Sequence, residues 1–260
     1  MKISIIGFGN LGRALASGLV KSQSVSPGEL YVCDNSPEAL KTASAPPYNA
    51  NASDDVNYVI QNSCIIFIVV KGYVLEQLAA VMDKRGFAGK TVVSFMAGVT
   101  MEKMQTLIAA EESGQTPQPP LLVRAMPSLG IAVCDGVIGH TKAPAEVAGI
   151  FRNLGIAYET APENIEKFTA FSGCGPGFAA YLLDAFAAAG MSMGFTPEMA
   201  EKITELTFKY AVSRGSFKET IKAVATPGGA TEQGILHMTE QSVPEIIEAA
   251  MQKAYKKMES

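Results

Sequence analysis

The chain is poor in the residues that metal centres and disulfide frameworks need. Its 260 residues include four cysteines: Cys33, Cys64, Cys134 and Cys174. No two of them form a Cys-x-x-Cys pair, which argues against a zinc site and a disulfide framework and favours thiols in a reducing compartment. Histidine occurs twice, at His140 and His237. Neither histidine lies in a recognisable site motif, so we expect both to be structural and expect no bound metal.

Long apolar runs and clusters of basic residues are also missing. No stretch approaches the ~18 apolar residues of a membrane helix, and the apolar stretch after Lys2 is too short for a signal-peptide core. The formal net charge is −4 and no Lys/Arg cluster occurs, which argues against a nucleic-acid partner. We therefore expect a cytoplasmic protein without a membrane or nucleic-acid partner, which binds a small molecule and a second copy of itself.

What the chain does have is a regular alternation of strand and helix patterns in its first part. Apolar runs predict strands at Lys2–Gly7, Leu30–Cys33, Cys64–Val70, Thr91–Phe95, Leu121–Ala125, Ala132–Gly139 and Gly155–Glu159. Helical patterns such as Asn10–Lys21 lie between them, and this alternation is typical of a doubly wound parallel sheet. A helix predicted to end at Ala110 is followed by the polar, proline-rich stretch Glu111–Pro120, which we expect to be a surface loop.

The pattern changes after Ala161, and from Pro162 to Ser260 it predicts helices and no strand. We therefore predict an α/β fold with an N-terminal Rossmann dinucleotide-binding domain at 1–161 and a C-terminal all-α dimerisation domain at 162–260. The stretch Ala179–Met191 is apolar on most helical faces, and a domain of about 100 residues has little interior in which to bury it. We expect this helix to be buried against a second subunit.

A glycine-rich turn predicts a dinucleotide site at the start of the chain. The turn Gly7-Phe8-Gly9-Asn10-Leu11-Gly12 follows the first predicted strand and opens the first predicted helix. In this context Gly7 allows a tight turn, Gly9 lets the pyrophosphate approach the backbone, and Gly12 lets the helix pack closely on the strand. The N–H groups at the helix start then face the phosphates. We expect NADH or NADPH to bind there.

Asp34, at the end of the second predicted strand, is the candidate contact for the adenosine ribose. It follows Gly12 at close to the ~20-residue spacing of the dinucleotide motif. A carboxylate there accepts a hydrogen bond from the 2′-hydroxyl and repels a 2′-phosphate, which favours NADH. Asn35, Ser36 and Lys41 are small polar or cationic groups that accept a 2′-phosphate if Asp34 turns away, so NADPH stays open.

A second glycine segment, Thr226–Thr231, joins two predicted helices and reads Thr-Pro-Gly-Gly-Ala-Thr. Pro-Gly-Gly favours a turn whose backbone N–H groups are free to point inward. Consecutive free N–H groups form a nest that suits a carboxylate. The hydroxyl of Thr231 either caps the helix that follows or donates a hydrogen bond to a substrate.

In order and spacing, these motifs resemble those of the Δ1-pyrroline-5-carboxylate reductase family along nearly the whole chain. The matching segments are Ile6–Gly12, Val70–Lys71, Ala97–Val99, Arg124–Pro127, Ser172–Pro176 and Thr226–Thr231. The resemblance implies a Rossmann domain followed by a helical domain that interlocks with a second subunit, in a homodimer or a larger homo-oligomer. It also implies transfer of hydride from NADPH or NADH to the C=N bond of Δ1-pyrroline-5-carboxylate, which forms L-proline.

The resemblance further implies a role for each matched segment. Residues that would contact the nicotinamide half of the cofactor are Lys71, Ala97, Met126 and Pro127, and Val70 would also contact the cofactor. Residues on the substrate side are Ser172, Thr226, Gly228, Gly229 and Ala230, of which the last three would hold the substrate carboxylate through backbone amides. The catalytic group would be Thr231, whose hydroxyl hydrogen-bonds the imine nitrogen, where negative charge would otherwise develop.

The chain departs from the usual family pattern near several of these positions. At five positions the residue here differs from the usual one: Gly72 replaces proline, Ser128 replaces asparagine, Cys174 replaces serine, Phe178 replaces tyrosine, and Glu232 replaces an apolar or small residue. These changes leave the hydride-transfer residues in place but bear on the choice of substrate. Two alternatives therefore stay open: a reductase of a different cyclic imine or keto acid, and a catalytically silent nucleotide-binding regulator.

Overall fold

The computed structural model describes residues 1–26, 28–108 and 118–259. The chain divides into two compact units, of which the first contains Met1–Cys174 together with the residues from Tyr255 on, and the second contains Gly175–Ala254. Most of the loop predicted at Glu111–Pro120, and the last two residues of the helix predicted to end at Ala110, lie outside the described residues.

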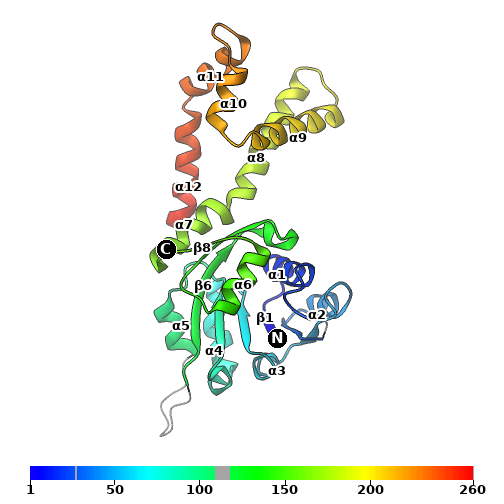
Figure 1. The fold of residues 1–260 in the computed structure, drawn as a ribbon, viewed down its shortest axis with the longest axis vertical. Coiled ribbons are helices and arrows are strands. Elements are labelled where there is room, and N and C mark those ends of the chain that lie inside the picture. Colours follow the sequence, from blue (N-terminus) through cyan, green and yellow to red (C-terminus); the bar gives the residue numbers. More distant parts are fainter. Residues whose placement is uncertain (27, 109–117, 260) are drawn as a thin grey trace. The chain divides into compact units, whose positions relative to one another are not determined.

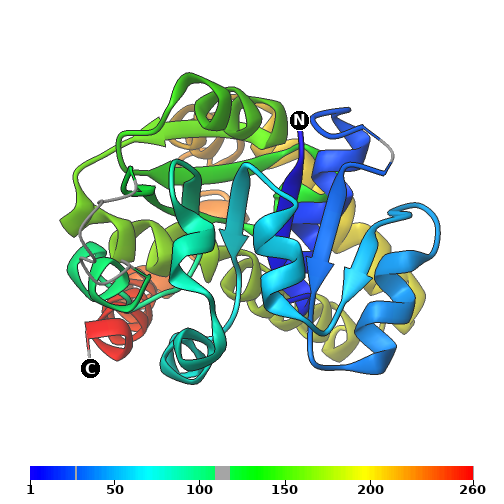
Figure 2. The ribbon, with the colours of Figure 1, turned by 90° about the horizontal axis from the view of Figure 1, so that it is seen from below.

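The first unit is built on a sheet of eight strands within the described part of the chain (Figure 1). The strands are β1 (Ile3–Ile6), β2 (Leu30–Cys33), β3 (Asn51–Ser53), β4 (Ile65–Ile68), β5 (Thr91–Ser94), β6 (Leu121–Pro127), β7 (Gly136–His140) and β8 (Gly155–Glu159). Their order is β3-β2-β1-β4-β5-β6-β7-β8, and neighbours are parallel except for β6 and β7. Figure 2 shows the blue and cyan strands of the amino-terminal half side by side. The strand order reverses between β1 and β4, which is where open α/β sheets bind ligands.

Helices cover both faces of this sheet because its strands are apolar on both faces. In β1, Ile3 and Ile5 belong to one buried cluster and Ile6 to the other. The first cluster joins the sheet to α1 (Asn10–Lys21), α2 (Pro37–Ser44) and α6 (Ala145–Leu154). The second joins it to α3 (Val56–Gln61), α4 (Leu75–Val81) and α5 (Met101–Ile108). The two clusters confirm the doubly wound architecture predicted from the strand–helix alternation.

The strand predicted at Ala132–Gly139 is wrong in its first half. Leu129–Val133 forms a 3₁₀ helix, and β7 starts only at Gly136. Between them Cys134 has a left-handed φ of 62°, where the chain turns before β7 pairs antiparallel with β6. Apolar periodicity over so short a run does not distinguish a strand from a helical turn.

The segment after the predicted domain boundary at Ala161 packs with the first unit. It forms α7 (Ile165–Phe168) and a π-helical turn at Thr169–Gly173. Ile165 is fully buried, and the ring of Phe168 fills the space that a side chain at Gly139 would need. The division between compact units therefore falls after Cys174, later than the change from mixed to helical sequence.

The second unit is helical, as predicted. It contains α8 (Gly175–Ser192), α9 (Pro197–Ser213), α10 (Phe217–Val224), α11 (Ala230–Glu240) and most of α12 (Val243–Glu259). The rings of Phe186 and Phe208 join α8 to α9 with their centroids 5.4 Å apart. Large apolar side chains nevertheless stay exposed on these helices, including Tyr181, Leu182, Met199, Leu206, Tyr210, Phe217, Ile221 and Leu236. None of the helices within the described ranges has the length and apolarity to cross a membrane.

Candidate functional site

The carboxyl ends of β1, β2 and β4 open into a pocket of about 810 Å³ in the first unit. Ten of the predicted cofactor residues line it: Gly7, Gly9, Asn10, Leu11, Asp34, Asn35, Val70, Lys71, Met126 and Pro127. These residues come from four separate segments of the sequence. The topology brings the segments together because parallel strands end at the same edge of the sheet.

The glycine turn has the geometry of a phosphate cradle. A Cβ added at Gly12 would lie 2.1 Å from the carbonyl oxygen of Gly7, so α1 packs directly on the turn. Gly7 has a φ of 101°, a value that residues with a side chain adopt only under strain. A Cβ at Gly9 would meet no protein atom within 4 Å, and Gly9 caps α1 without a side-chain hydrogen bond. The open space faces uncapped helical N–H groups, so the cradle fits the pyrophosphate of a dinucleotide.

Asp34 connects the glycine turn to the end of β2. Its Oδ2 accepts a hydrogen bond from the Phe8 N–H over 2.6 Å, and its Oδ1 accepts one from the Ser36 N–H over 2.9 Å. The carboxylate is half-buried and lines the pocket. Each carboxylate oxygen can accept a second hydrogen bond, so Asp34 can hold the turn and still receive a ribose hydroxyl. Contact with the ribose stays a prediction.

Four predicted cofactor residues do not line the pocket. Phe8 is a core residue whose ring meets Tyr48 edge-on at 5.4 Å, and Gly12 lies under the turn. Ser36 caps α2 by accepting from the Ala39 N–H. Ala97 is exposed, and its carbonyl oxygen would be 3.2 Å from a Cβ added at Gly72. Contact of these four residues with the cofactor stays a prediction.

Six residues that the motifs do not single out also line the pocket: Cys33, Asp54, Gln77, Leu78, Leu129 and Thr169. Gly173 and Cys174 of the matched segment Ser172–Pro176 line it too. The pKa of the Cys33 thiol is raised to about 11, first by burial and then by the negative charges of the Asp34, Asp55 and Asp54 carboxylates, in that order. This end of the pocket is therefore electronegative, and the Cys33 thiol stays protonated at neutral pH. Asp54 follows β3 at the same sheet edge, but the pattern does not predict this three-residue, Asn-Ala-Ser strand.

Ser172, predicted on the substrate side, lies in the π-helical turn of the first unit. Its hydroxyl donates to the carbonyl oxygen of Phe168 over 2.9 Å. Its neighbours Gly173 and Cys174 line the pocket, and Ser172 does not. The hydroxyl therefore stabilises the turn that presents Gly173 and Cys174, and its contact with substrate stays a prediction.

The other predicted substrate residues lie in the second unit, at Thr226–Thr231. The Gly229 N–H donates to the Thr226 carbonyl oxygen over 2.9 Å, and Gly228 has a φ of 74°. With Pro227 before Gly228, this is a type II turn. Gly229 is the N-cap of α11, so Thr231 lies in the first helical turn and has no capping role. Thr231 is exposed, and its contact with the imine nitrogen stays a prediction.

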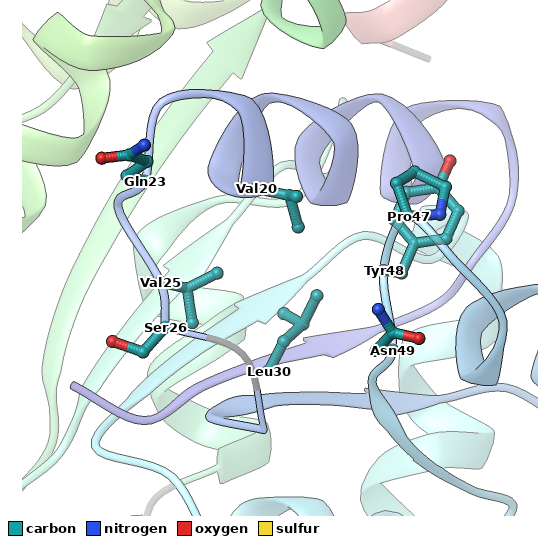
Figure 3. Close-up of a pocket in the computed structure, with 8 residues that line it drawn as sticks. All are labelled: Val20, Gln23, Val25, Ser26, Leu30, Pro47, Tyr48 and Asn49. Atoms are coloured by element: carbon teal, nitrogen blue, oxygen red, sulfur yellow. The ribbon is translucent and has the colours of Figure 1, made fainter.

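A second pocket of about 450 Å³ lies at the opposite, amino end of β2 (Figure 3). Leu30 faces Val20 of α1 across the pocket, and Pro47, Tyr48 and Asn49 line one side. None of the described residues that line it has a charged side chain. Tyr48 contacts both the Ser17 hydroxyl and the ring of Phe8. Through Tyr48 the lining of this pocket therefore packs against Phe8 of the glycine turn.

Comparison with known proteins finds separate matches for the two ends of the chain. A family model described as pyrroline-5-carboxylate reductase dimerisation matches residues 162–260, and one described as NADP oxidoreductase, coenzyme F420-dependent, matches residues 2–98. A pyrroline-5-carboxylate reductase of Aquifex aeolicus is 29% identical and aligns over 98% of this chain and 97% of its own. A pyrroline-5-carboxylate reductase of Escherichia coli is 27% identical and aligns over 99% of this chain and 97% of its own. The chain is therefore similar to pyrroline-5-carboxylate reductases along nearly its whole length, and its C-terminal part matches their dimerisation model.

Solved structures share the fold over the full length. A Plasmodium falciparum pyrroline carboxylate reductase with NADP bound superimposes with a TM-score of 0.86 at 21% identity, covering 100% of this chain and 97% of that chain. A reductive aminase from Aspergillus terreus in complex with NADPH superimposes with a TM-score of 0.60 at 18% identity, covering 98% of this chain and 94% of that chain. At these identities the structures support the Rossmann-plus-helical fold and nothing finer.

The departures from the family pattern in the first unit have local structural roles. Ser128 is buried, and its Oγ accepts from the Val137 N–H over 3.0 Å, which ties β6 to β7. Gly72 allows a close approach, because a Cβ there would lie 3.1 Å from the side chain of Val99. Cys174 lines the pocket as a half-buried free thiol. None of these three changes removes a residue that forms the phosphate cradle.

Proposed function

We propose that the protein reduces the cyclic imine Δ1-pyrroline-5-carboxylate to L-proline with NADPH or NADH, as the last step of proline biosynthesis. The observation that carries the proposal is the convergence of the predicted cofactor residues on one pocket. This pocket lies in a chain that aligns along 98% of its length with a pyrroline-5-carboxylate reductase. The reduced nicotinamide supplies the hydride, and the protein supplies binding, orientation and electrostatic stabilisation.

The residues of the chain divide this work. The N–H groups that follow Gly9 hold the pyrophosphate, and Val70, Lys71, Met126 and Pro127 hold the nicotinamide half. In the second unit, the backbone amides of Gly228–Ala230 bind the substrate carboxylate. The Thr231 hydroxyl donates to the imine nitrogen, so the charge that develops there during reduction is stabilised. No histidine is needed for this chemistry.

We also propose that the protein works as a homodimer, or a larger homo-oligomer, formed through its C-terminal helices. The support is the dimerisation family model over 162–260 and the exposed apolar side chains of α8–α11. Exposed apolar patches of this kind mark association surfaces. The four free cysteines further support a cytoplasmic location.

The deciding experiment is a steady-state assay of the full-length protein. Oxidation of NADPH and NADH is followed with Δ1-pyrroline-5-carboxylate, with its six-membered-ring analogue, and with a keto acid. The proposal expects turnover with the five-membered imine to exceed the other two by at least about tenfold in kcat/KM. Preference for the six-membered imine or the keto acid would support the second reductase alternative. Tight cofactor binding without turnover would support the regulator.

Cofactor choice is tested at Asp34. Because Asp34 and Asp54 make the adenosine end of the pocket electronegative, Asp34→Ser is expected to raise kcat/KM for NADPH relative to NADH by about tenfold. Serine is small, and its hydroxyl oxygen can accept a hydrogen bond from the Phe8 N–H. Asp135→Ser removes the same charge outside the pocket and serves as the control. An unchanged NADPH-to-NADH ratio in Asp34→Ser would remove Asp34 from cofactor selection.

A further inference from the structure

Glu232 departs from the family pattern and contacts a predicted substrate-binding group directly. Its Oε2 accepts a hydrogen bond from the Gly228 N–H over 2.7 Å. Gly228 is one of the three residues whose backbone amides we assign to the substrate carboxylate. A carboxylate of the protein therefore occupies a donor that the carboxylate of the substrate would use.

The local geometry explains why Glu232 reaches this donor. Gly229 is the N-cap of α11, so Glu232 is the third helical residue, from which an acid reaches back toward the chain before the helix. The type II turn leaves the Gly228 N–H out of its own hydrogen bond, which runs from Gly229 to Thr226. A Cβ at Gly228 would meet nothing within 4 Å, so this side of the turn is open.

One carboxylate at this turn is favourable and two are not. The amides and the start of α11 attract a negative charge. Once Glu232 supplies it, a second carboxylate has to displace the first and then stays close to its charge. Like charges a few ångströms apart repel, even where solvent screens them.

We propose that Glu232 is a specificity-determining residue, which weakens the preference for cyclic imines that carry a carboxylate over those that lack one. The inference rests on the proposed function, because it takes Gly228–Ala230 as the site for the carboxylate. A cyclic imine without a carboxylate forms no hydrogen bond with the Gly228 N–H, so its binding is independent of Glu232. The chain is thus suited to a wider range of cyclic imines than one with an uncharged residue at this position.

A purely structural role for Glu232 predicts something different. An acid at the third helical position also stabilises a helix start, and its loss would then affect every substrate alike. Glutamine separates the two roles, because it keeps the length of the side chain and an oxygen that accepts from Gly228 but removes the charge. Glu240, on the same helix and 73% exposed in its side chain, offers a matched control for charge alone.

The test compares the full-length wild type with Glu232→Gln, Glu232→Ala and Glu240→Gln. The substrates are Δ1-pyrroline-5-carboxylate and 1-pyrroline, which has the same ring and no carboxylate. In Glu232→Gln we expect kcat/KM for the carboxylate-bearing imine to rise about five- to tenfold, mainly through KM, and that for 1-pyrroline to change less than about twofold. Glu240→Gln should leave the ratio of the two unchanged.

A binding measurement gives a second readout that does not depend on turnover. L-proline and pyrrolidine are titrated calorimetrically into the protein with oxidised cofactor present. Glu232→Gln should lower the Kd of proline by the same factor and leave that of pyrrolidine unchanged. An unchanged proline-to-pyrrolidine ratio, or an equal loss with both imines, would overturn the inference. Absence of turnover with either imine in the wild type would instead count against the proposed function, and the titration would still decide the role of Glu232.

Discussion

Gly12→Ala is expected to destabilise the protein, whereas Gly9→Ala is expected to leave it folded and to weaken cofactor binding. A Cβ at position 12 would lie 2.1 Å from the carbonyl oxygen of Gly7, a backbone atom that cannot move without shifting the turn. Overpacking against backbone costs about 3 kcal/mol or more, which corresponds to a fall in apparent Tm of about 6 °C or more. At position 9 a Cβ would meet no protein atom within 4 Å, so the fold tolerates it.

The same methyl group at position 9 would occupy the space left for the pyrophosphate. We expect Gly9→Ala to raise the Kd of NADPH and NADH at least about tenfold while the apparent Tm stays within about 2 °C of wild type. Thermal unfolding without cofactor and calorimetric titration with cofactor measure the two effects separately. A wild-type Tm for Gly12→Ala would show that the turn can adjust to the added methyl group. Wild-type cofactor affinity in Gly9→Ala would show that the pyrophosphate does not bind next to Gly9.

The pair also shows how far a glycine motif can be interpreted from sequence alone. The spacing predicts one role for Gly9 and another for Gly12, and the structure gives them opposite surroundings, one open and one closed. The strand β1 before the turn and the helix α1 after it are predicted by apolar periodicity. In β1, Ile3 and Ile5 pack into one hydrophobic cluster and Ile6 packs into the other. Local pattern suffices here because every level of the structure agrees with it.

Other parts of the fold depend on contacts that no local pattern encodes. The edge strand β3 is short and polar, and only its pairing with Tyr31–Cys33 makes it a strand. The segment at Ile165–Phe168 has a helical pattern but packs on the sheet, because Gly139 leaves room for the ring of Phe168. Asp54 lines the cofactor pocket at the end of β3, and no motif singles it out.

The contact between Gly228 and Glu232 illustrates the same limit at the substrate side. The Pro-Gly-Gly pattern predicts a turn with free N–H groups. The structure forms the turn, but the Gly229 N–H donates to the Thr226 carbonyl oxygen within it. The pattern does not show that one N–H is taken by a side chain four residues later. The capping alternative for Thr231 is likewise resolved only by the structure, which gives the cap to Gly229.

Removal of the Thr231 hydroxyl is expected to lower kcat about 100-fold, with a smaller change in KM. In the proposed reaction the hydroxyl donates to the imine nitrogen most strongly as charge develops there, so its loss raises the barrier more than it weakens binding. Thr231→Val keeps the branched shape and removes the donor. Thr231→Ser keeps the donor and should retain kcat within about fivefold of wild type.

Two further readouts separate a catalytic loss from a structural one. Thr231 is exposed in the first turn of α11 and does not cap it, so both variants should unfold near the wild-type Tm. The cofactor residues lie in the first unit, so the Kd of NADPH should be unchanged in both. Wild-type turnover in Thr231→Val would remove the hydroxyl from the chemistry. Hydrogen bonding to the imine nitrogen would then have to come from another group, and the backbone amides of Gly228–Ala230 would carry the substrate side alone.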